Sequence, residues 1–75
     1  MKKKETVKLS TEFIKLNQLL KFAGLAATGG EANLMIEEGL VSFAGEVCTV
    51  RGKKCRPGDT VEVRDGENGC LLILE

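Results

Sequence analysis

The sequence predicts an α+β fold in which a pair of helices packs on a small, mostly antiparallel sheet. Two observations predict this fold. Apolar residues recur at helical spacing in the first half of the chain, and they alternate along the second half, after Gly39. A length of 75 residues allows one domain at most, so residues 1–75 are expected to form a single domain. Hydrophobic residues make up 43% of the chain, a normal globular share.

The first helix is predicted over residues 13–23. Its apolar stripe consists of positions spaced by three and four, namely Leu16, Leu19, Leu20 and Ala23. The hydroxyls of Ser10 and Thr11, followed by Glu12, supply the chemistry of a helix start, and Asn17 is an alternative cap. Gly24 is the expected C-terminal stop.

The second helix is predicted to begin at Thr28 and to end at Gly39. Thr28 and Glu31 have the spacing of a capping box, in which Thr28 caps the helix and the Glu31 side chain reaches back. Its apolar face is expected to contain Ala32, Met35, Ile36 and Leu40. Two helices this short cannot persist alone in water, so they must pack on each other.

Alternating residues predict the strands. A short first strand is expected at residues 5–9, and residues 1–5 are expected to be a flexible end. The later strands are expected at 41–43, 46–50, 60–63 and 70–74, with a polar loop at 65–69. Because alanine disfavours positive φ, the Ala44-Gly45 turn is predicted to be type I with a bulge, or type II, rather than type I′. Pro57-Gly58 predicts a type II turn.

Charge is arranged in blocks although the formal net charge is zero. Residues 1–21 carry six lysines and two glutamates, and residues 22–50 carry four glutamates and no basic residue. The segment 51–56 reads RGKKCR, and residues 57–75 are again mostly acidic. Local field rather than net charge determines what a surface attracts, so the basic loop at 51–56 is the strongest candidate site.

Residue types for catalysis and metal binding are scarce. The chain has no histidine, its three cysteines form no C-x-x-C pair, and it lacks a phosphate-cradling loop. We therefore expect no catalytic residues, no metal and no cofactor, and we interpret Cys48, Cys55 and Cys70 as small hydrophobic residues. The polar residues that follow Lys2–Lys4 argue against a signal peptide, no segment is apolar enough to span a membrane, and the unpaired cysteines favour the cytoplasm.

An ordered set of short motifs resembles the S-four RNA-binding domain, the αL motif found in ribosomal small-subunit protein four. The motifs are Lys15-Leu16-Asn17-x-x-Leu20, Gly24, Thr28, Glu31-Ala32, Ile36, Gly39, Val41-x-Phe43-x-Gly45 and Pro57-Gly58-Asp59. They cover about residues 14–63. The TGGEA stretch and the RGKK loop are most similar to the stand-alone, YbcJ-like bacterial members. The resemblance implies binding of structured RNA, of ribosomal or transfer type, with the ribosome as a candidate partner and a monomer as the expected state.

The resemblance and the charge pattern together nominate two groups of RNA-binding residues. The first is basic: Lys15, Arg51, Lys53, Lys54 and Arg56. The second lies at the start of the second helix, where Thr28, Gly29, Gly30 and Asn33 occupy positions at which the family commonly has serine and arginines. The glycines either admit a phosphate to bare backbone N–H groups or merely allow a tight turn, and the turn is the slightly favoured interpretation.

Other interpretations remain open. The acidic residues Glu31, Glu37, Glu38 and Glu46 could serve a protein–protein adaptor, although we expect this block to face away from the basic loop. The three phenylalanines fall at core-like positions, so no stacking platform for single-stranded RNA is expected. Recognition through shape and backbone phosphates is therefore favoured over the reading of individual bases.

Overall fold

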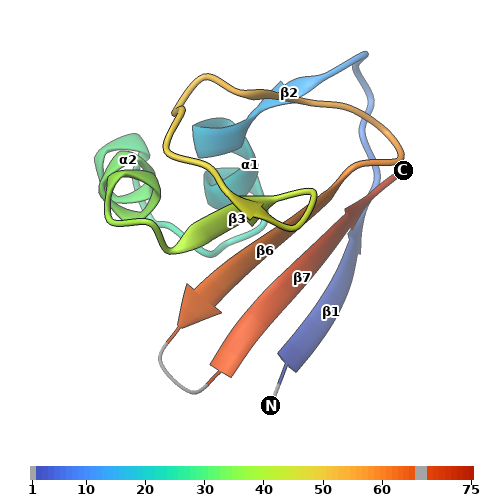
Figure 1. Ribbon diagram of the computed structural model, residues 1–75. Helices are drawn as coiled ribbons and strands as arrows, with labels where there is room; N and C mark the ends of the chain where they lie inside the picture. The colour runs from blue at the N-terminus through green and yellow to red at the C-terminus, as the bar shows by residue number, and fades with distance from the viewer. Residues whose placement is uncertain (1, 66–67) are drawn as a thin grey trace.

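A computed structural model of the chain describes residues 2–65 and 68–75. Within these residues it contains two helices, a mixed sheet of five strands and a separate two-stranded pair (Figure 1). The elements are β1 (Lys2–Val7), β2 (Ile14–Lys15), α1 (Leu16–Phe22), α2 (Gly29–Glu37), β3 (Val41–Phe43), β4 (Glu46–Val47), β5 (Lys54–Cys55), β6 (Thr60–Asp65) and β7 (Asn68–Leu74). The predicted α+β class is confirmed.

The larger sheet has the order β1-β7-β6-β3-β4. Its neighbours run antiparallel except for β1, which pairs parallel with β7. The second pair joins β2 to β5 in antiparallel register and lies on the helix side of the molecule (Figure 1). This small pair places the basic loop against the start of α1.

One hydrophobic core lies between the helices and one face of the sheet. The alternation of β6 and β7 turns Val61, Val63, Cys70, Leu72 and Leu74 inward, and the register puts Val61 opposite Leu72 and Val63 opposite Cys70. The helices contribute the fully buried side chains Leu16, Leu19, Leu20, Ala32 and Ile36. These helical residues are the ones that the periodicity predicted, together with partly buried Met35.

Both helices end as predicted at glycines with positive φ. Gly24 has φ 79° and Gly39 has φ 78°. After α1, the N–H of Leu25 donates to the carbonyl of Leu20, and after α2 the N–H of Leu40 donates to the carbonyl of Met35. These are the long hydrogen bonds of a Schellman motif, which satisfies carbonyls that the helix itself leaves free.

The predicted start of α1 was wrong. The helix begins at Leu16 rather than residue 13, its cap is Lys15 in extended conformation, and no side chain caps it. Ile14 and Lys15 pair instead with β5. Carbonyl groups of the basic loop accept hydrogen bonds from the first N–H groups of the helix. These tertiary contacts replace the local cap that was predicted from Ser10 and Thr11.

The predicted cap of α2 by Thr28 is confirmed, and the Glu31 side chain also reaches back toward the helix start. The Thr28 side chain accepts from the N–H of Glu31 at 3.1 Å, and Glu31 Oε2 accepts from the N–H of Ala27 at 3.4 Å. The Glu31 carboxylate thus accepts from the residue before the cap, Ala27, rather than from the N–H of Thr28 itself.

The Ala44-Gly45 turn contradicts its prediction. Ala44 has φ 51° and Gly45 has φ 88°, and Phe43 pairs with Glu46 across a two-residue loop. Two positive φ values are the mark of type I′, whose twist matches that of the flanking strands. The hairpin therefore imposes on Ala44 a conformation that alanine does not favour. The predicted type II turn at Pro57-Gly58 is confirmed, because Gly58 has φ 98° and the N–H of Asp59 donates to the carbonyl of Arg56.

The expectation of a flexible end at residues 1–5 was wrong for residues 2–5. They belong to β1, which extends back from the predicted strand, and they pair with residues 69–72 of β7. The pairing supplies backbone partners that the sequence could not reveal. Of the polar loop predicted at 65–69, residues 66 and 67 lie outside the described residues, and the flanking residues belong to β6 and β7.

Candidate nucleic-acid interface

The pairing of β2 with β5 sets two lysines directly opposite each other. Lys15 lies across from Lys54, and both side chains are exposed. Side chains opposite each other in an antiparallel pair have Cβ atoms about 4.5–5.5 Å apart, and like charges there repel. An anion bound between the two ammonium groups would remove that repulsion. The register thus creates a cationic position from residues 39 apart in sequence.

The backbone of the basic loop is fixed to the N-terminus of α1. The N–H of Leu16 donates to the carbonyl of Lys53 at 2.8 Å, and the N–H of Asn17 donates to the carbonyl of Arg51 at 3.2 Å. These bonds satisfy helix N–H groups that have no partner within the helix. The loop is consequently held along the helix start rather than projecting freely into solvent.

Two aromatic rings orient adjacent lysines of the loop. Lys53 Nζ lies 5.0 Å from the centre of the Phe43 ring, and Lys54 Nζ lies 4.9 Å from the centre of the Phe13 ring. Such cation–π contacts are worth about 0.5–1 kcal/mol at exposed sites. The two ammonium groups are therefore held by rings from different segments, Phe43 of β3 and Phe13 before β2. The expectation that the phenylalanines are core residues was wrong for Phe22, which is 68% exposed, whereas Phe43 is half-buried and packs against the core. Phe13 is half-buried.

Arg51 lies beside the acidic block. Its Nη1 is 3.9 Å from Glu37 Oε1, and both side chains are more than half exposed. An exposed pair of this length contributes little to stability, since solvent screens it. It nevertheless corrects the expectation that the acidic block faces away from the basic loop, because Glu37 competes directly for the Arg51 guanidinium.

Asn17 connects the basic loop to α2. Its Nδ2 donates to Asn33 Oδ1 at 3.1 Å across the helix pair, while its backbone N–H holds the Arg51 carbonyl. Asn33 is therefore part of the same assembly as the loop, and Gly29 and Gly30 lie one turn before it on α2. Thr28 is committed to capping.

The backbone conformation at Gly29 and Gly30 does not require glycine. Neither Gly29 nor Gly30 has positive φ. A Cβ at Gly29 would meet nothing within 4 Å, and one at Gly30 would lie 3.9 Å from Thr28 Oγ1, an ordinary contact. The tight-turn interpretation that the sequence slightly favoured is therefore not supported. The glycines leave their own backbone N–H groups without side-chain cover, while the N–H of Glu31 donates to Thr28 and the Glu31 carboxylate lies at the same helix start.

Arg56 lies at the other end of the basic loop, where the Pro57-Gly58 turn begins. Its backbone N–H donates to Asp59 Oδ2 at 2.8 Å, and its side chain is exposed. No contact in the described residues joins it to Lys15 or to Asn33. The structure thus brings Lys15, Arg51, Lys53, Lys54 and Asn33 together, and it leaves Arg56 and the Thr28-Gly29-Gly30 turn at the margins.

The cysteines behave as the sequence predicted. Cys55 and Cys70 are buried and Cys48 is half-buried, and all three are free thiols. Burial, assisted by the charge of Asp59, raises the pKa of the Cys55 thiol from 9.0 to about 11. Burial followed by the charge of Glu5 also raises the pKa of Cys70. Over residues 2–65 and 68–75 no group of three potential metal ligands occurs.

The comparison with known families decides the assignment. A family model of the S4 domain matches residues 7–69, most of the chain. The chain belongs to the S4 domain family. No curated protein matches it. The S4 domain is an RNA-binding, non-catalytic domain, so the family indicates RNA as the partner in general terms. None of the helices in the described part of the chain is long and apolar enough to cross a membrane.

Three contacts of the candidate interface were missed at the sequence level. Asn17 was assigned to the family motif and considered as a cap, without its contact to Asn33, and Phe13 and Phe43 were placed at core-like positions, without their contacts to lysines. The alternation of Phe13 with Lys15 is a weak signal that both lie on one side of a strand. No local signal could identify the Asn17–Asn33 contact or the Phe43–Lys53 contact, because both depend on how distant elements pack.

Proposed function

We propose that this S4 domain binds structured RNA, of ribosomal or transfer type, mainly through contacts between its basic side chains and backbone phosphates. The observation that carries the proposal is the cross-strand pair formed by Lys15 of β2 and Lys54 of the basic loop, which also presents Arg51 and Lys53. Two ammonium groups that face each other across a strand pair do not stabilise the fold, because like charges repel. They do favour binding of a polyanion, since each phosphate that a lysine neutralises releases condensed counterions.

Several features support recognition of RNA shape rather than of a flexible strand. The loop backbone is tied to α1, and two rings hold its lysines, so the charges have a defined arrangement before RNA arrives. Arg51 adds a planar fork suited to two-pronged phosphate contact. The uncovered first turn at Gly29 and Gly30 offers a second phosphate position one turn from Asn33.

The decisive experiment compares wild type with a Lys53→Glu, Lys54→Glu double variant on a structured RNA in low and moderate salt. Each phosphate contact contributes about −0.7 to −0.9 to the slope of log affinity against log salt, so losing both should flatten the slope by roughly 1–2 units. Lys8→Glu, Lys21→Glu is the matched control, because it changes the net charge equally through exposed side chains outside the loop.

The control should retain the wild-type slope. Equal affinity of wild type and the loop variant at every salt concentration, with both proteins folded by circular dichroism, would end the assignment to this loop. That result would favour the adaptor role of the acidic residues instead.

A further inference from the structure

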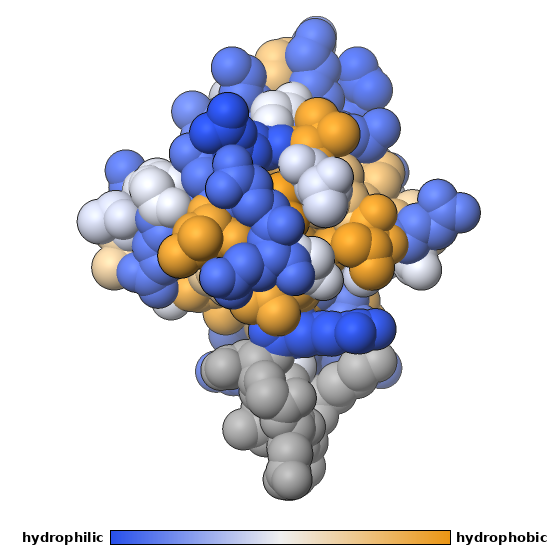
Figure 2. All heavy atoms as spheres, turned by 60° about the vertical axis from the view of Figure 1, so that its left-hand side comes forward, coloured by the Kyte–Doolittle hydropathy of each residue, from blue (hydrophilic) through white to orange (hydrophobic). Residues whose placement is uncertain are grey.

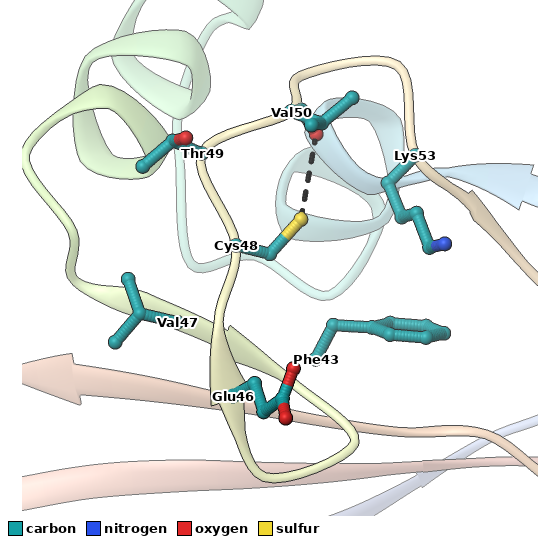
Figure 3. Close-up of a pocket in the computed structure, with 7 residues that line it drawn as sticks. All are labelled: Phe43, Glu46, Val47, Cys48, Thr49, Val50 and Lys53. Carbon is teal, nitrogen blue, oxygen red and sulfur yellow. Dashed lines mark hydrogen bonds between the residues drawn. The ribbon is translucent and has the colours of Figure 1, made fainter.

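A small open pocket lies between the β3–β4 hairpin and the basic loop (Figure 3). We call it the hairpin pocket, and its volume is about 280 Å³. Pockets that hold drug-sized ligands occupy about 300–1,000 Å³, so the hairpin pocket suits a single ring system. Its lining consists of Phe43, Glu46, Val47, Cys48, Thr49, Val50 and Lys53.

The pocket exposes apolar surface beside a charged loop. Val47 and Val50 are 55% and 59% exposed, which is unusual for valine. Figure 3 shows Cys48, Val50, Lys53 and Phe43 around one space, with the Cys48 thiol turned toward the Val50 carbonyl at 3.9 Å. On the side of the molecule that carries α2, hydrophilic surface separates the apolar patches (Figure 2). The pocket is therefore an open depression with both polar and apolar lining, too small for a broad protein-docking face.

The pocket lining carries one negative group, Glu46, and one positive group, Lys53, and these opposite charges together favour a neutral occupant with N–H donors. Glu46 contributes a carboxylate that repels an anion and can only accept hydrogen bonds. The ammonium of Lys53 lies over the Phe43 ring at the same pocket. A planar, uncharged ring with N–H donors on its edge can contact Val50 and donate to the Glu46 carboxylate.

Lys53 belongs both to the hairpin pocket and to the basic loop. A strand whose phosphate contacts the loop therefore has its neighbouring base within reach of the pocket. Proteins that read RNA sequence commonly do so on unpaired bases, by apolar or aromatic contact with the ring and hydrogen bonds to its edge. We propose that the hairpin pocket receives one unpaired nucleobase of the bound RNA, with Glu46 favouring a base such as guanine that presents adjacent N–H donors. This inference rests on the proposed function and adds one base to recognition by shape.

The test uses two RNA hairpins that differ by a single bulged guanosine in the stem. Wild type should bind the bulged RNA at least fivefold more tightly than the paired one, as expected from about 1 kcal/mol for one base contact. Val50→Ser should abolish this ratio. Leu34→Ser is the matched control, since Leu34 is similarly exposed, at 54%, and does not line the pocket. Glu46→Gln should reduce the preference for guanosine over uridine in the bulge.

Because each variant is compared on the bulged and the paired RNA, a change in general charge attraction affects both affinities equally and leaves their ratio unchanged. Circular dichroism establishes that each variant is folded. Equal binding of both RNAs by wild type would overturn the pocket proposal and leave the proposed function standing. A preference that survives Val50→Ser would overturn it as well. Failure to bind either RNA would overturn the proposed function and the inference together.

Discussion

Replacing Lys15 with glutamine should move stability and RNA binding in opposite directions. In the free protein the substitution removes a like-charge repulsion with Lys54, and it leaves the contact of Lys54 with Phe13 intact. Cross-strand pairs contribute about 0.2–1 kcal/mol, and exposure to solvent favours the lower end of that range. Because 1 kcal/mol shifts Tm by about 4–8 °C in a domain this small, Tm should rise by about 1–3 °C.

Binding should weaken at the same time. Loss of one phosphate contact flattens the salt slope by about 0.7–0.9, which corresponds to a roughly five- to eightfold weaker affinity at 0.1 M salt if counterion release dominates. The assay is a fluorescence titration of a labelled structured RNA at several salt concentrations, paired with a thermal melt of the free protein followed by circular dichroism.

Lys21→Gln is the matched control, because Lys21 is an exposed basic residue in the last turn of α1. It interacts favourably with the helix C-terminus, so its loss should lower Tm slightly and leave the salt slope unchanged. If Lys15→Gln lowers Tm, or if both variants change the slope equally, the interpretation of the lysine pair as a phosphate site is refuted.

Three further outcomes are expected. Gly29→Ala and Gly30→Ala should each raise Tm, since alanine favours helix over glycine by up to about 1 kcal/mol. Both variants should also bind RNA more weakly in titrations, because the added methyl group hinders approach of a phosphate to this turn; unchanged affinity would exclude a phosphate site there. Glu37→Gln should strengthen RNA binding a few-fold at low salt by releasing Arg51, and a weaker complex would contradict this. Cys55, whose pKa is about 11, should react with a thiol reagent at pH 8 far more slowly than Cys48. Because the thiol of the unfolded chain ionises near 9.0, the contribution of Cys55 to the free energy of unfolding should fall between about pH 9 and 11 in denaturant melts.

Local chemistry predicted the start of α2, the C-terminal ends of both helices and the approximate positions of β1, β3, β4, β6 and β7, but it missed β2 and β5. Gly24 and Gly39 act through their own backbone conformation, and the Thr28 side chain accepts from the backbone N–H three residues on, so all three roles can be read from the sequence. The same holds for the type II turn at Pro57-Gly58, where one residue fixes φ and the next tolerates a positive value. The inward alternation of β6 and β7 likewise follows from the two-residue period of a strand.

Predictions failed where a distant segment supplied the partner. The hydroxyls before α1 were available as caps, but carbonyl groups of Arg51 and Lys53 took that place. Residues 2–5 lacked any local reason to be ordered until β7 offered a parallel neighbour. At Ala44 the twist of the hairpin overrode the preference of alanine against positive φ.

The sequence by itself determined the α+β class and the concentrated basic loop, because helical period, strand alternation and charge blocks are properties of neighbouring residues. Only the tertiary structure decided what the loop faces. The register of β2 with β5 placed Lys15 opposite Lys54, and helix packing joined Asn17 to Asn33 and brought Glu37 to Arg51. Contacts between residues far apart in the chain depend on how the core closes, and no local pattern encodes that geometry.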